Sequence, residues 1–240
     1  MSNLAFANPI EVPPGSRCEH LLDLSTASSR TVRTQDSRNR DQLFHEAKLV
    51  EPILRKFLHT IFRELDVEVI LAPIKDSQRA GEKADSKKAG DYSQILDFTR
   101  GAVVAGSFAE VSRVVAFVRD LAAREKIEIV KEEERFESNV RELGYRDWQF
   151  NLALPRPDAP GKTHIVELQV RHRKLHELKE AEGDVLYREI RALQAAQKAF
   201  PFGAERAARL FWLKERHKRL FNQVYEEAKA AEGISRFVGK

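Results

Sequence analysis

The sequence predicts a single α/β or α+β domain, a mixed sheet of about five strands flanked by N- and C-terminal helices. Segments with apolar residues every three or four positions, the spacing of amphipathic helices, lie toward both ends of the chain. Five short β-rich segments lie between them. One of these segments is followed directly by a helix-capping pattern, which indicates a strand–helix unit.

The composition is that of a globular protein. The 240 residues are 42% hydrophobic and 32% charged, and no stretch approaches the roughly 20 apolar residues of a membrane span. No secretory signal pattern begins the chain and Cys18 is the single cysteine, so we expect a cytoplasmic protein without membrane contact. The net charge of +4 favours partners such as nucleotides or RNA without requiring them.

The first element is expected after a tail. Residues 1–40 are rich in Pro, Ser, Thr and Arg, and we expect them to be flexible, ahead of one domain over residues 41–235. Apolar residues at helical spacing then predict a helix to Leu65, with Asp41 as its N-cap. Pro52 within this helix predicts a kink or a restart.

The centre of the chain alternates β-rich segments with turns. We expect strands over residues 67–71, 95–105, 127–130, 146–154 and 164–170. Ser107 and Glu110 form a capping box that opens a helix after the second strand. Three prolines and a glycine join the last two strands into a predicted hairpin.

Two further helices are expected at the C-terminal end. The first covers about residues 175–199. The second carries an apolar stripe from Ala207 to Ala228 and ends near Gly233.

Acidic residues interrupt two predicted strands. Alternate side chains of a strand share a face, so Glu167 and Gln169 point to one side and the apolar residues around them to the other. If Asp97 ends a neighbouring strand, Asp97 and Glu167 together can hold Mg²⁺, which favours one or two carboxylates plus substrate phosphates. The alternative is that Glu167 and Gln169 only face water on a half-exposed sheet.

A basic loop and a tyrosine are further candidates. The segment from Lys75 to Lys88 combines cations with glycine and can bind phosphates, or it is a solvated loop of alternating charge. Tyr145 follows Gly144 and can stack on a base, or it is a core tyrosine. The histidines form no zinc-binding pattern, and no serine-hydrolase or dinucleotide-binding motif is present.

These residues occur in the order found in the RelA/SpoT-type nucleotide pyrophosphokinases, and the chain resembles that family over about residues 45–195. The match consists of a basic loop, a strand with an aspartate, a Gly-Tyr pair, a Glu-x-Gln segment and a histidine in the following helix. The residues are Lys75, Ser77, Arg79 and Lys83; Asp97; Gly144, Tyr145, Arg146 and Asp147; Glu167, Gln169 and Arg171; and His176.

The resemblance implies a RelA/SpoT-like nucleotidyltransferase fold that transfers pyrophosphate from ATP to the ribose 3′-hydroxyl of GDP or GTP, which makes ppGpp or pppGpp. It implies that Asp97 and Glu167 are the catalytic pair and the Mg²⁺ ligands, and that Tyr145 stacks on the acceptor base. The basic loop would bind ATP through Lys75, Ser77, Arg79 and Lys83. Further substrate contacts would come from Asp147, Gln169, Arg171 and His176.

Two motifs depart from the family pattern. Typical synthetases have Ser and His where this chain has Asp147 and Gln149. Typical synthetases also have the motif Asp-x-x-Gly-x-Arg. In this chain the arginine and the glycine stand at Arg100 and Gly101, which are not the motif positions. Asp147 could select a different base edge or repel a phosphate, which leaves the acceptor open.

An enzyme is favoured, and three questions stay open. The long members of the family also carry a hydrolase domain, and we do not expect one here because residues 1–40 are too short for it. A growth-inhibiting toxin acting on tRNA 3′ ends or adenosine nucleotides is therefore one alternative. A catalytically inactive module that binds nucleotides or RNA is another. A homo-oligomer is also possible.

Overall fold

The computed structural model describes residues 33–75, 80–81, 84, 90–199 and 203–237. Most of the expected tail therefore lies outside the described residues. The same is true of most of the basic loop, including three of its four predicted ATP-binding residues: Ser77, Arg79 and Lys83.

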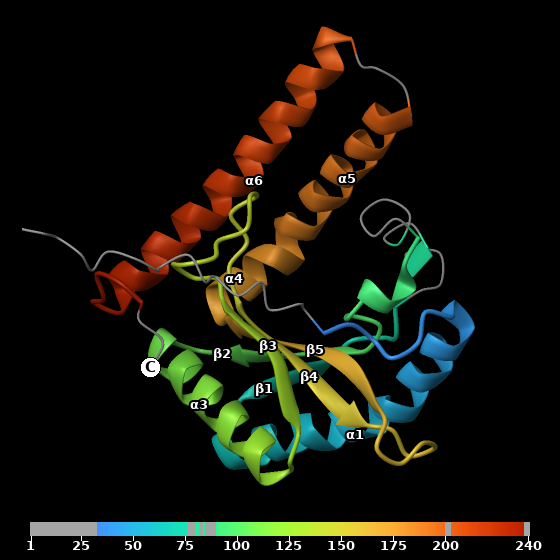
Figure 1. Ribbon diagram of the computed structural model, residues 1–240. Helices are drawn as coiled ribbons and strands as arrows, with labels where there is room; N and C mark the ends of the chain where they lie inside the picture. Colours follow the sequence, from blue (N-terminus) through green and yellow to red (C-terminus); the bar gives the residue numbers. More distant parts are fainter. Residues whose placement is uncertain (1–32, 76–79, 82–83, 85–89, 200–202, 238–240) are drawn as a thin grey trace, which may run out of the picture. The chain divides into compact units, whose positions relative to one another are not determined.

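The centre of the molecule is a mixed sheet of five strands in the order β1–β2–β5–β4–β3 (Figure 1). β2 and β5 run parallel, and the other neighbouring pairs run antiparallel. The expected mixed sheet of about five strands is confirmed. The strands are β1 (Glu68–Leu71), β2 (Arg100–Ala105), β3 (Glu128–Glu134), β4 (Trp148–Pro155) and β5 (Thr163–His172).

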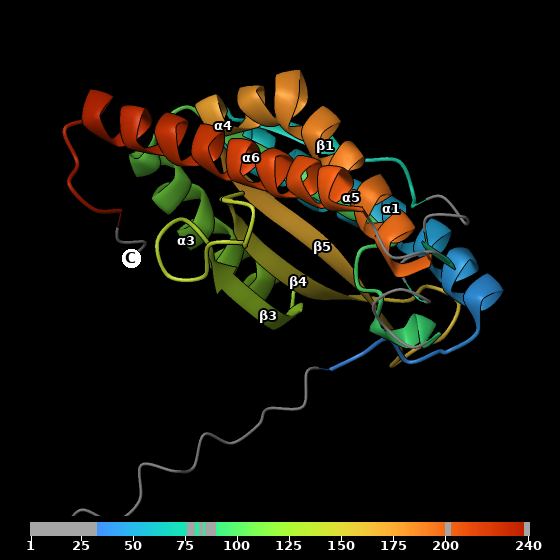
Figure 2. The same ribbon diagram turned by 90° about the horizontal axis from the view of Figure 1, so that it is seen from above.

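Helices cover the sheet unequally. α1 (Arg40–Leu65) and α3 (Phe108–Arg124) pack against one face (Figure 1). On the other side, α4 (Arg173–Leu178) leads through a π-helical turn into α5 (Asp184–Ala199), which runs beside α6 (Ala204–Ala231) (Figures 1 and 2). No helix among the described residues combines the length and the apolar character needed to cross a bilayer.

The main core lies between the sheet and α1 and α3. Leu168 and Val170 of β5 are fully buried there, while Glu167 and Gln169 are partly exposed on the other face. The predicted alternation along β5 is confirmed. The predicted cap of α3 is also present, because the hydroxyl of Ser107 accepts a hydrogen bond from the backbone N–H of Glu110 at 3.1 Å.

The start of α1 differs from the expectation. The N-cap is Asn39, not Asp41, because the side-chain oxygen of Asn39 accepts a hydrogen bond from the N–H of Gln42 at 2.9 Å. Asp41 lies in the first turn, where its charge suits the positive end of the helix dipole. Pro52 lies inside one continuous helix, so the restart does not occur.

Other elements also have different bounds, among them β3, which was expected over residues 127–130 and extends to Glu134. The strand expected over residues 95–105 begins only at Arg100, because polar side chains in the first half bond away from the sheet: Thr99 donates to the carbonyl of Ala47 in α1 at 3.2 Å. The helix expected over 175–199 contains the π-helical turn Lys179–Gly183. Gly183 ends that turn, and its missing side chain leaves space for the ring of Phe221.

Part of the expected tail lies against the domain. The side chain of Gln35 is buried, donates to the carbonyl of Ile165 and accepts from the N–H of Ile165, both at 2.8 Å. Gln35 therefore satisfies the backbone of β5 beside the parallel pair.

A buried ion cluster joins α1 to the β4–β5 hairpin. Glu46 has no exposed surface, and its two oxygens lie 2.6 Å from Nη1 of Arg156 and 3.1 Å from Nδ1 of His164. Burial of a carboxylate is costly unless partners replace its water, and these two side chains do so.

We expect Glu46→Ala to lower the free energy of unfolding by about 3–5 kcal/mol, because it leaves Arg156 and His164 without their shared carboxylate in a buried position. Urea denaturation followed by circular dichroism measures this loss. The matched control is Glu51→Ala in the same helix, which removes a surface ion pair with Arg55 and is expected to cost less than about 1 kcal/mol. Equal losses in the two variants would contradict a structural role for the cluster.

Candidate functional site

The sheet face opposite α1 and α3 is polar across its middle. In the strand register, Glu167 of β5 lies between Arg100 of β2 and Asn151 of β4. One step along the strands, Gln169 lies between Ala102 and Gln149 in the same way. We call this surface the polar face; it consists of Arg100, Lys131, Glu133, Arg135, Asp147, Gln149, Asn151, Glu167, Gln169 and Arg171.

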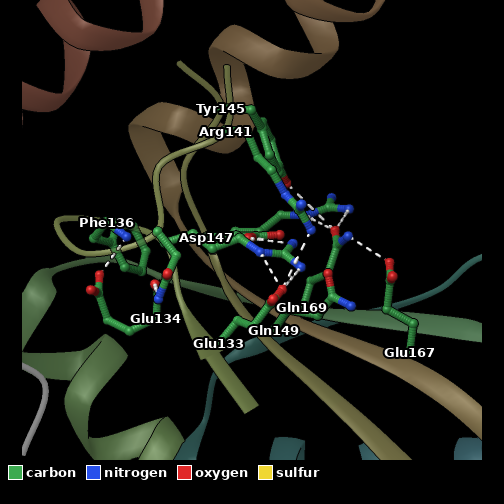
Figure 3. A network of polar contacts seen from close by, with 12 residues as sticks. Glu133, Glu134, Phe136, Arg141, Tyr145, Asp147, Gln149, Glu167 and Gln169 are labelled. Atoms are coloured by element: carbon green, nitrogen blue, oxygen red, sulfur yellow. Dashed lines mark hydrogen bonds and ion pairs between the residues drawn. The ribbon is translucent and has the colours of Figure 1, made fainter. Parts of the chain in front are cut away.

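Gln169 connects the motif residues on this face (Figure 3). Its amide Nε2 donates to Oε1 of Glu167 at 2.7 Å. Its Oε1 accepts from Nη2 and Nε of Arg171 at 2.6 and 3.0 Å, and the hydroxyl of Tyr145 donates to the same oxygen at 3.5 Å. Because Arg171 occupies the amide oxygen, the amide nitrogen is held toward Glu167.

His176 extends this chain into α4. Its Nδ1 lies 3.3 Å from Nη1 of Arg171. Burial lowers the pKa of His176, and the positive charge of Arg171 lowers it further, so the ring stays neutral at physiological pH and Nδ1 accepts the hydrogen bond. The structure thus brings together five sequence-predicted residues: Tyr145, Glu167, Gln169, Arg171 and His176.

Asp97 lies just ahead of β2, the parallel neighbour of β5. The backbone N–H of Glu167 donates to the carbonyl of Thr99 at 3.0 Å, so the segment carrying Asp97 borders β5 directly. Nζ of Lys75 lies 2.5 Å from Oδ2 of Asp97, and both side chains are about nine-tenths buried. The described start of the basic loop is therefore anchored at this carboxylate.

Asp147 lies below the surface of the polar face. It has no exposed area, and its Oδ1 is 3.3 Å from Nη1 of Arg135, which also donates to Glu133. Burial raises the pKa of Asp147, against the charges of Arg135, Arg171 and Arg141. Its assignment to the substrate stays a prediction, and its contacts are with the protein.

Glu133 balances the cations around Asp147. Burial raises the pKa of Glu133, but hydrogen bonds from Lys131 and Arg135 outweigh that effect and lower it to about 2. Glu133 is therefore ionised at neutral pH. Neither Glu133 nor Arg135 was singled out from the sequence. The alternation of side chains along β3 is a signal that could have identified Glu133, whereas Arg135 follows the end of the strand.

Tyr145 belongs partly to the core and partly to the site. Its ring packs edge-on against Phe221 of α6, with centroids 5.6 Å apart, and is half-buried. Burial raises its pKa, so the hydroxyl remains protonated and is a donor to Gln169. Figure 3 shows Arg141 alongside the tyrosine ring. The two interpretations of Tyr145 from the sequence are therefore compatible.

Gly144 sets the position of Tyr145 for two reasons. Its φ of +82° is a conformation that L side chains rarely adopt. A Cβ atom there would also lie 2.9 Å from the backbone oxygen of Lys218 in α6. Only glycine lets the Tyr145 loop approach α6 this closely.

We expect Gly144→Ala to destabilise the protein more than Gly161→Ala, a control with a similar φ of +79° but open space around its Cβ position. Both variants incur the left-handed backbone cost of about 1–2 kcal/mol, and only the first also forces α6 and the loop apart. Thermal unfolding compares the two, and equal shifts in melting temperature would show that the approach to Lys218 carries no cost.

The fold is that of the RelA/SpoT-like pyrophosphokinase domain, as expected from the sequence. The small alarmone synthetase 2 from Bacillus subtilis has a TM-score of 0.59 and 16% identity, covering 83% of this chain and 98% of its own. The small alarmone synthetase 1 from the same organism, bound to its product pppGpp, has a TM-score of 0.55 and 16% identity, with coverage of 80% and 92%.

An effector protein has a similar fold. The Type VI effector Tas1, solved in complex with its immunity protein, has a TM-score of 0.51 and 18% identity and covers 81% of this chain and 100% of its own. No protein-family model and no curated protein matches the sequence. At these identities the likeness establishes the fold, and the chemistry has to be argued from the site.

Proposed function

We propose that this protein transfers the β,γ-pyrophosphate of ATP to the ribose 3′-hydroxyl of a guanosine nucleotide, as in ppGpp or pppGpp synthesis. The observation that carries the proposal is the connected set of Tyr145, Arg171, Gln169 and Glu167 on the polar face of this fold. It offers an aromatic ring for the base, cations for phosphates and one oriented carboxylate.

The carboxylate oxygens of the site are suitable ligands for Mg²⁺. Asp97 and Glu167 are carboxylates from adjacent segments, and hard oxygen ligands in small number are what Mg²⁺ takes alongside substrate phosphates. When bound, Mg²⁺ would neutralise phosphate charge during transfer. Lys75 brings a further positive charge to Asp97, and Arg79, Lys83 and Ser77 of the same loop are proposed to bind the ATP phosphates.

The residues of the chain would act mainly by positioning and charge, which is what this type of transfer needs. The 3′-oxygen of the acceptor attacks the β-phosphorus of ATP, the bond from that phosphorus to the α–β bridging oxygen breaks, and AMP leaves. Glu167, held by Gln169, accepts the hydroxyl proton. Tyr145 would stack on the base, while Arg171 and His176 face the acceptor.

A second candidate is a toxin acting on adenosine nucleotides or tRNA 3′ ends, favoured by the likeness to the Tas1 effector. The two are separated by incubating the purified protein with γ-labelled ATP, magnesium and, separately, GDP, GTP, AMP, ADP, ATP and bulk tRNA. Label in GDP or GTP supports the proposal; label in an adenosine nucleotide or tRNA supports the second candidate. Nucleotide binding without any transfer would leave a binding module.

Glu167→Gln is expected to reduce transfer at least about a hundredfold in a folded protein, because it removes a charge needed in the transition state. The rate is measured with labelled ATP at saturating acceptor, and folding by circular dichroism.

The matched control is Glu132→Gln. Glu132 is also a strand carboxylate, but it bonds Trp148 at 2.8 Å and Arg119 on the opposite face of the sheet. This variant should keep the wild-type rate. Undiminished transfer in Glu167→Gln would overturn the assignment of Glu167.

A further inference from the structure

Two buried hydrogen-bond donors without partners flank Glu167. They are Nε of Arg100, in register on β2, and Nδ2 of Asn151, in register on β4. Within the described residues neither atom has a hydrogen-bond partner. Buried polar groups are nearly always paired, so two orphaned donors on either side of one carboxylate indicate a place where a ligand supplies the acceptors.

Asn151 is the more informative of the two. It is 2% exposed, and its Oδ1 already accepts from Nε2 of Gln149 at 3.2 Å. The orientation of the amide is therefore set, and Nδ2 is the group left to bind. An unpaired buried donor destabilises the fold. The missing partner has to be an oxygen with a lone pair.

The neighbouring charge restricts which oxygen this can be. Residues opposite each other on antiparallel strands have Cβ atoms roughly 5 Å apart, so the ligand atom at Asn151 lies close to the carboxylate of Glu167. Where no cation lies between them, that carboxylate repels a phosphate oxygen, whereas it tolerates a neutral hydroxyl. If Glu167 takes the proton of a ribose 3′-hydroxyl, the adjacent ribose oxygen is the one on C2′.

We propose that Asn151 is a specificity-determining residue that donates from Nδ2 to the 2′-oxygen of the acceptor, so that the site selects ribose over 2′-deoxyribose. This inference rests on the proposed function. Lys131, the register neighbour of Asn151 on β3, pairs with Glu133 at 2.6 Å and is 37% exposed, so it can move aside to admit the sugar.

The test compares GDP with 2′-deoxy-GDP, and ADP with 2′-deoxy-ADP, by calorimetric titration of the wild type and of Asn151→Leu. All four probes keep the 3′-hydroxyl. We expect the wild type to bind the preferred ribonucleotide roughly tenfold more tightly than its deoxy form, the effect of one hydrogen bond. In Asn151→Leu the ratio should fall to about one, in a protein that circular dichroism shows to be folded, although Nε2 of Gln149 loses its acceptor.

Gln35→Leu is the matched control, because it removes a buried amide whose two ends are both bonded to Ile165. It should lower the melting temperature and leave the ribose preference intact. If Asn151→Leu does not fold, Asn151→Ala takes its place. A preference that persists in the Asn151 variants, or one that the wild type lacks, overturns the inference.

Calorimetry measures binding without catalytic turnover. The proposed pyrophosphate transfer and the proposed role of Asn151 can therefore be refuted independently of each other. Ribose preference dependent on Asn151 in a protein that transfers no pyrophosphate would refute the proposed function alone. Transfer at equal efficiency to ribose and deoxyribose acceptors would refute the role of Asn151 alone. Absence of binding to all four probes would refute both.

Discussion

The pairing of β5 with β2 on one side and β4 on the other is the constraint on which the site depends. Through it, Glu167 lies beside the segment of Asp97, and Gln169 lies within reach of Tyr145. Side chains alternate between faces, so a slip of one residue would turn Glu167 into the core and Leu168 onto the polar face. The apolar residues packed under α1 and α3 therefore fix the position of the polar ones.

The polar face is stable because its charges compensate one another. Arg135 forms ion pairs with both Asp147 and Glu133. Arg171 donates two hydrogen bonds to the amide oxygen of Gln169. Such a network satisfies buried groups that would otherwise destabilise the fold. Two donors beside Glu167, Nδ2 of Asn151 and Nε of Arg100, have no partner. Oδ2 of Asp147 also has no partner, so the bonding of the polar face is incomplete at Asp147 as well as around Glu167.

Local patterns in the sequence predicted the order of elements, the cap at Ser107 and the alternation along β5. They did not predict the limits of β2, because Thr99 bonds to α1, which is distant in sequence. The position of Asn151 beside Glu167 and the burial of Asp147 could not be predicted either. The first depends on the register between strands and the second on burial by residues of several elements, and neither leaves a local pattern.

Arg100 is displaced along the motif relative to the family pattern, but it stays on the same face of β2. In the family pattern Asp-x-x-Gly-x-Arg, the arginine would stand at Ala102, beside Gln169 in the register. In this chain it stands at Arg100, two residues earlier and on the same face, beside Glu167. The shift moves a positive charge from the amide to the carboxylate. It follows that the environment of Glu167 departs from the pattern of typical synthetases, as the Tyr145 motif does at Asp147 and Gln149.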